Sequence, residues 1–168
     1  MAYSGQIPRL TVLFLSCVNA VCFGQTVSIR LVNFTNESPV SNQRVYVSGI
    51  SGKAAMNDMD ERLKLIREPR TADLSLVTDT LGRAGFDLPK PAPAYFYIRA
   101  ALSGPHWDCT CVVRVSTEEV VQKGFVVLSS YGARGKPKSP IQPKSGEVLF
   151  ALRPTPLWVR LLWPLLKG

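Results

Sequence analysis

Apolar and polar residues alternate in several short stretches of the chain, a pattern typical of β-strands that turn one face toward a core. The clearest example is Thr26–Asn33, in which apolar Val27, Ile29 and Leu31 are separated by polar residues. Similar stretches indicate further strands at 45–47, 74–78, 84–88, 95–102, 106–115, 125–129 and 147–152. The pattern predicts an all-β fold, a β-sandwich of about seven strands with short helices.

The segment 78–88 combines turn chemistry with a following strand. Asp79 can accept backbone hydrogen bonds at the start of a turn, and Gly82 can adopt the positive φ that closes it. A type I turn followed by a left-handed glycine is a common connection in β-hairpins. We therefore predict a tight β-hairpin whose second strand contributes to the core of the sandwich.

The segment 48–71 interrupts the strand pattern. Met59, Leu63 and Ile66 have helical spacing within a charged stretch, which predicts a short helix after Asn57. An excursion of this length is long for a compact sandwich. Two interpretations remain open, an insertion that carries binding and a tolerated surface loop.

A second short helix is predicted between two later strands. Ser116 and Glu119 have the spacing of a capping box, and Gly124 can end the helix. The segment 132–146 is rich in Gly, Pro and Lys and contains no acidic residue, so we interpret it as a flexible basic loop.

Residues 1–24 have a different composition from the rest of the chain. Arg9 is their only charged residue, and an apolar run extends over 10–23. This pattern predicts a secretory signal peptide, and the run is short for a membrane span. Cleavage after Gly24 or Ala20 would leave a small residue at the cut, and retention as a signal anchor is the alternative. We predict an exported protein that is periplasmic, extracellular or envelope-associated.

Composition limits the remaining classes of function. The chain has 168 residues, of which 46% are hydrophobic, enough for one globular domain with a substantial core. The formal net charge is +8, but outside the basic loop the basic residues are scattered and do not alternate with aromatic residues. This distribution argues against a nucleic-acid-binding surface.

The C-terminal segment 156–168 is apolar with two tryptophans. Trp158 and Trp163 accompany the cations Arg160 and Lys167, and a helix over this segment would be amphipathic. The segment is too short to span a bilayer. We predict contact with an envelope protein or a membrane surface, and packing on the domain's own sheet is the alternative.

Removal of the signal peptide would leave two cysteines, Cys109 and Cys111, which do not form a disulfide framework. Residues two apart in a strand have Cα atoms about 6.5 Å apart, so a disulfide between them would need a local bulge. Two buried thiols and a soft-metal site for an ion such as Cu(I) are the alternatives. His106 falls on the opposite face of a regular strand, which argues against a metal site shared with the two cysteines. No serine lies in a nucleophile-elbow sequence. We therefore predict no catalytic site and no cofactor.

The pattern Thr-Asp-x-x-Gly-x-Ala-x-Phe-x-Leu at 78–88 resembles the hairpin of carboxypeptidase regulatory-like domains. The opening strand and the aromatic strand at 95–102 also fit, so the match covers 27–102. The resemblance implies an Ig-like or transthyretin-like (prealbumin-like) sandwich that serves as an accessory module for folding support, adhesion or ligand binding. The long 48–71 segment, the cysteine strand, the basic loop and the tail, which is similar to the tails of some exported bacterial proteins, lie outside this pattern. Transthyretin-like hydrolases end in Tyr-Arg-Gly-Ser, whereas this chain ends in Leu-Leu-Lys-Gly, so that activity is not expected.

The sequence thus predicts a non-enzymatic exported module for binding or structural support at the cell envelope. The alternative is a redox or soft-metal-handling protein that uses Cys109 and Cys111. We divide the chain into a signal peptide (1–24), a β-sandwich domain (25–131), a basic loop (132–146), a final strand (147–155) and an amphipathic tail (156–168).

Overall fold

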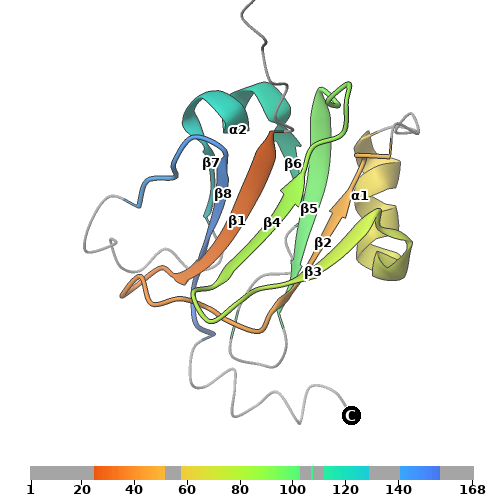
Figure 1. The fold of residues 1–168 in the computed structure, drawn as a ribbon. Helices are drawn as coiled ribbons and strands as arrows, with labels where there is room; N and C mark the ends of the chain where they lie inside the picture. Colours follow the sequence, from red (N-terminus) through yellow and green to blue (C-terminus); the bar gives the residue numbers. More distant parts are fainter. Residues whose placement is uncertain (1–24, 52–57, 103–106, 108–111, 129–140, 156–168) are drawn as a thin grey trace, which may run out of the picture.

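The computed structural model of the chain describes residues 25–51, 58–102, 107, 112–128 and 141–155. These residues form two four-stranded sheets that face each other (Figure 1). Sheet A has the order β4 (Arg83–Asp87), β1 (Thr26–Asn33), β8 (Glu147–Leu152), β7 (Phe125–Leu128). Sheet B has the order β3 (Leu74–Val77), β2 (Arg44–Ser48), β5 (Tyr95–Ala101), β6 (Val112–Ser116). The helical elements are α1 (Asp58–Arg67), η1 (Pro69–Thr71) and α2 (Thr117–Lys123), so the predicted all-β sandwich with short helices is confirmed.

The final strand, β8, lies inside sheet A. It runs parallel to β1 on one side and to β7 on the other. The other edge of β1 pairs antiparallel with β4. All six residues of β8 are buried, as expected for a strand that is covered on both faces. The strand that follows the basic loop therefore belongs to the same sandwich as the strands before it.

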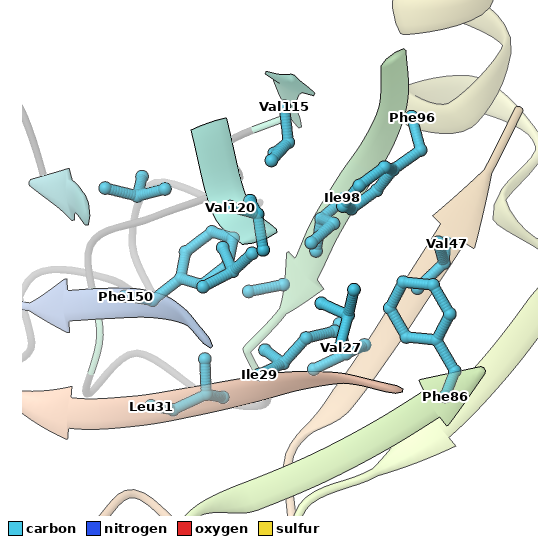
Figure 2. Packing of buried hydrophobic residues seen from close by; sticks show 14 of the residues in the cluster. Val27, Ile29, Leu31, Val47, Phe86, Phe96, Ile98, Val115, Val120 and Phe150 are labelled. Carbon is cyan, nitrogen blue, oxygen red and sulfur yellow. The ribbon is translucent and has the colours of Figure 1, made fainter. Parts of the chain in front are cut away.

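The core lies between the two sheets (Figure 2). Val27, Ile29 and Leu31 of β1 point into it and have no exposed surface, which confirms the alternation predicted for this strand. From opposite sheets, Phe86 and Phe96 meet edge to face with ring centroids 5.7 Å apart, a favoured arrangement for aromatic pairs.

The predicted hairpin at 78–88 is wrong, although the predicted turn chemistry is present. The Asp79 carboxylate accepts the backbone N–H groups of Leu81 and Arg83, both at 2.8 Å, and Gly82 has a φ of 70°. However, β3 pairs with β2 and β4 pairs with β1, so the turn crosses from sheet B to sheet A. The crossing is fixed by β1, because the N–H of Leu31 donates to the carbonyl of Gly82 at 2.8 Å.

Both predicted helices are present. The hydroxyl of Ser116 accepts the N–H of Glu119 at 3.4 Å, as the capping-box spacing predicted. Gly124 ends α2 with a φ of 79°, and its N–H donates to the carbonyl of Val120. The helix predicted after Asn57 is α1, within the 48–71 segment.

Several predictions concern residues outside the described part of the chain. These are the signal peptide at 1–24, most of the basic loop, and the tail at 156–168. Of the strand predicted at 106–115, the structure describes β6 from Val112 onward and Trp107, which forms an isolated bridge with Pro154. Within the described ranges, no helix is both long enough and apolar enough to cross a membrane.

Candidate binding surface

Helix α1 lies on the outer face of sheet B, on the side away from sheet A (Figure 1). Leu65 is 2% exposed and packs in a small cluster with Tyr46 of β2, Tyr97 of β5 and Val112 of β6. This cluster is separate from the core between the sheets. A single leucine thus provides the main apolar contact of α1 with the sandwich.

Two arginines add polar contacts between α1 and the sheet. The guanidinium of Arg99 on β5 donates to the carbonyls of Leu65 and Ile66, both at 2.8 Å. The last carbonyls of a helix have no partner within the helix and carry partial negative charge, so a cation there stabilises it. At its middle, the Nη2 of Arg62 donates to the carbonyl of Val112 at 3.4 Å.

The start of the insertion is also fixed to the sheet. The carboxylate of Asp73, just before β3, accepts the N–H groups of Ile50 at 2.8 Å and Ser51 at 3.1 Å. Partial burial raises the pKa of Asp73, but hydrogen bonds from the Ser51 side chain and from the backbone at Gly49, Ile50 and Ser51 outweigh burial and lower this pKa below its usual value. The segment is therefore anchored where it leaves β2 and where the chain enters β3.

The other face of α1 is apolar and exposed. Met59, Leu63 and Ile66 keep 61%, 37% and 43% of their surface accessible. We call these three residues the α1 stripe. Amphipathic helices usually bury their periodic apolar residues. Here the sandwich buries Leu65, which lies outside the predicted period, and leaves the α1 stripe in solvent.

A second surface feature is an open hollow of about 380 Å³ between the segment before β5 and the start of α2. Its serine and threonine hydroxyls have structural partners, because Thr117 Oγ1 donates to the carbonyl of Pro93 and Ser116 caps α2. Its one carboxylate, Glu118, accepts from the side-chain amide of Gln122 at 3.1 Å. These lining groups hold the fold together and form no nucleophile–base pair.

The site residues predicted from the sequence lie elsewhere. Cys109, Cys111 and the tail residues Trp158, Arg160, Trp163 and Lys167 are all outside the described residues, and their predicted roles stay predictions. In the part that the structure describes, no three His, Cys, Asp or Glu residues are grouped so that they could bind a metal. The α1 stripe is thus the candidate site that the described residues offer.

No protein-family model matches the chain, and no curated protein matches it. Among solved structures, it is similar to BcpA, the major pilin subunit of Bacillus cereus, with 11% identity and a TM-score of 0.34. It is also similar to the fimbrial protein FimP from Actonomyces oris, with 10% identity and a TM-score of 0.39. Each match covers 79% of this chain, but only 30% of BcpA and 29% of FimP. Both are distant likenesses, and the chain spans less than a third of either protein.

Proposed function

We propose that the chain is an exported, non-enzymatic β-sandwich module for binding or structural support at the cell envelope, and that the α1 stripe is its binding surface. One observation carries this proposal: α1 is anchored to the sandwich by contacts that leave its own periodic apolar residues in solvent. Single exposed apolar residues are common on proteins. Three of them together on one face of a short helix are a feature of interaction surfaces.

The energetics of α1 support this interpretation. Ordering each residue of a helix costs about 1–2 kcal/mol of backbone entropy. Leu65, Arg62 and Arg99 offset part of this cost on the sheet side, while the α1 stripe contributes little to the isolated chain. A partner that buries the α1 stripe would supply apolar contacts that the sandwich leaves unused.

Export and envelope contact rest on the sequence. Residues 1–24 have the pattern of a signal peptide, and the tail at 156–168 carries Trp158, Arg160, Trp163 and Lys167, which suit an envelope protein or a membrane surface. We also propose that the module is of the carboxypeptidase regulatory-like kind. The residue pattern at 78–88 supports this membership. The segment that carries the pattern connects the two sheets and does not form a hairpin.

The proposal predicts the size of the exported protein's complexes. The chain is expressed in its native host, and extracts prepared without denaturant are separated by size. We expect the native chain in particles larger than its monomer, and the triple variant Met59→Gln, Leu63→Gln, Ile66→Gln in smaller particles than the native chain. Lys64→Gln, on another face of the same helix, is the matched control and should behave as the native chain does. A triple variant that is folded by circular dichroism and still elutes in the larger particles would refute the proposal.

A further inference from the structure

The α1 stripe has the spacing of a helix–helix contact. Its residues lie at i, i+4 and i+7, which is the spacing of the apolar seam between two packed helices. At 100° per residue, the three side chains cover about 60° of the helix surface. A narrow seam of this kind fits the convex surface of another helix.

The charges around the α1 stripe decide which partner fits. Residues 58–71 contain four acidic and four basic side chains, so the segment has no net charge. A membrane-binding helix carries an excess of basic residues on its polar face, because each cation near an anionic leaflet adds attraction. The α1 segment lacks this excess. A protein partner with charges of both signs is therefore favoured over lipid.

The two signs are separated along the helix. The first turn holds the acids Asp58, Asp60 and Glu61, and the last turn holds Lys64 and Arg67. Asp60 and Arg67 are seven residues apart, so they lie on the same flank of the α1 stripe at opposite ends. The flank thus presents one acid near its start and one base near its end.

This arrangement is complementary to itself. In a two-fold symmetric pair of antiparallel helices, each flank meets the same flank of the other helix in the reverse direction. Asp60 would then lie opposite the partner's Arg67, and the same contact would recur on the other side of the axis. In a parallel two-fold pair, each flank would meet the opposite flank of the other helix, so Asp60 and Arg67 would not face each other. Asp60 also interacts within its own chain, and a carboxylate can accept several hydrogen bonds at once.

The flank on the other side of the α1 stripe is compatible with this pairing. Its cation is Arg62, which is directed to the sheet by its hydrogen bond to the carbonyl of Val112. The Arg62 side chains of two paired helices are therefore held away from the contact. Both flanks are compatible with the antiparallel arrangement.

We infer that the α1 stripe binds the α1 stripe of a second copy of this chain, with the two helices antiparallel about a two-fold axis. This inference rests on the proposed function and names its partner. Two helices of ten residues bury less than the roughly 800 Å² per partner of a standard interface. The dimer is therefore weak and depends on protein concentration, and it forms most readily where other contacts confine the chain at one surface.

Cysteine cross-linking tests the geometry directly. Leu63 lies at the middle of the α1 stripe, next to the proposed axis. Leu63→Cys is therefore introduced into the full chain with its native cysteines Cys17, Cys22, Cys109 and Cys111 replaced by serine. We expect copper-phenanthroline oxidation to yield a disulfide-linked dimer whose fraction rises with protein concentration. Lys64→Cys, on another face of α1, is the matched control and should stay largely monomeric. Equal dimer yields from the two variants would overturn the inference.

Charge reversal tests the orientation. In the Leu63→Cys background, Arg67→Glu should lower the dimer yield several-fold, because Asp60 then faces an acid. Adding Asp60→Lys should restore the yield, since the pair is present again with its signs exchanged. Yields that do not respond to either change would show that the helices do not pair in this way.

A third measurement separates this inference from the proposed function. Native chain and triple stripe variant are each mixed with phosphatidylglycerol vesicles and sedimented. Binding that the triple variant loses would identify lipid as the occupant and overturn the inference. If the triple variant is released from the larger particles in cells but Leu63→Cys forms no dimer, the α1 stripe binds a different protein: the proposed function then stands and the second copy is refuted. If the triple variant stays in the larger particles and Leu63→Cys forms no dimer, the proposed function and the pairing with a second copy are both refuted.

Discussion

The two leucines of α1 provide a matched test of how the helix is anchored. Leu65 is 2% exposed and Leu63 is 37% exposed, and both can be replaced by alanine in the same helix. The replacements change helix propensity equally, so any difference in unfolding free energy reports packing.

The structure sets the expected size of that difference. Leu65 packs against Tyr46, Tyr97 and Val112, and Leu→Ala at a buried position costs about 2–5 kcal/mol. Because the cluster lies on the outside of one sheet, we expect the lower half of this range, about 2–3 kcal/mol. Leu63 has no comparable contact with the described sandwich, and its replacement should cost less than about 1 kcal/mol.

Urea denaturation measures the two values. With a slope of roughly 1–3 kcal/mol per molar, Leu65→Ala should lower the urea midpoint by about 0.7–3 M, and Leu63→Ala by less than half of that shift. Hydrogen exchange over 58–67 shows whether α1 opens before the sandwich does, in which case Leu65→Ala raises exchange there more than it shifts the global midpoint. Equal effects of the two variants on both measurements would refute the proposed anchoring of α1.

Three further predictions concern the sandwich and the base of the insertion. Gly82→Ala should lower the free energy of unfolding by more than about 1 kcal/mol, because Gly82 has a positive φ and an added Cβ would lie 2.5 Å from a backbone oxygen of β1. Gly85→Ala, whose added Cβ has its nearest atom at 3.7 Å, should be tolerated, and thermal unfolding compares the two variants. Glu147→Gln should lower the free energy of unfolding in urea by about 1–3 kcal/mol, because the buried Glu147 carboxylate accepts a hydrogen bond from the guanidinium of Arg30 at 2.7 Å. A loss as small as that of an exposed ion pair would contradict this. The native chain should be more stable than Asp73→Asn at neutral pH, because a depressed carboxyl pKa adds stability while the group is ionised. This difference in stability should shrink as the pH falls below about 4 and through the lowered pKa of Asp73. A difference that is the same at pH 3 and pH 7 would argue against this role.

Local chemistry could be predicted from the sequence where it depends on neighbouring residues. The alternation in β1, the hydrogen bonds of the Asp79 turn, the positive φ of Gly82 and the cap at Ser116 are all present in the structure. Each of these features is determined within a few residues of the chain. Short-range patterns are sufficient for them.

The partners of strands could not be predicted in this way. Both β3 and β4 turn apolar residues toward the core, and they do so from opposite sheets. Alternation shows which face of a strand is buried but not which sheet the strand joins. The hairpin prediction was wrong for this reason. Pairing of β4 with β1, and the hydrogen bond from Leu31 of β1 to Gly82, depend on residues that are distant in the sequence.

The face of α1 that packs on the sheet could not be predicted for the same reason, because it depends on residues that are distant in the sequence. The periodic residues Met59, Leu63 and Ile66 predicted a helix, but their spacing did not indicate that Leu65 would be the buried residue. That choice depends on where Arg99 meets the end of α1 and on the space beside Tyr46 and Tyr97. The candidate site is thus visible only once sheet B is assembled.

The claim that the α1 stripe is a binding surface can be tested most directly by its accessibility in the cell. Leu63→Cys, in the background without native cysteines, is exposed to a membrane-impermeant thiol reagent on intact cells and as dilute purified protein. We predict fast labelling of the purified protein and strong protection in cells, with Lys64→Cys labelled at similar rates in both. Equal labelling of Leu63→Cys in cells and in dilute solution would contradict the claim, because the α1 stripe would then have no partner.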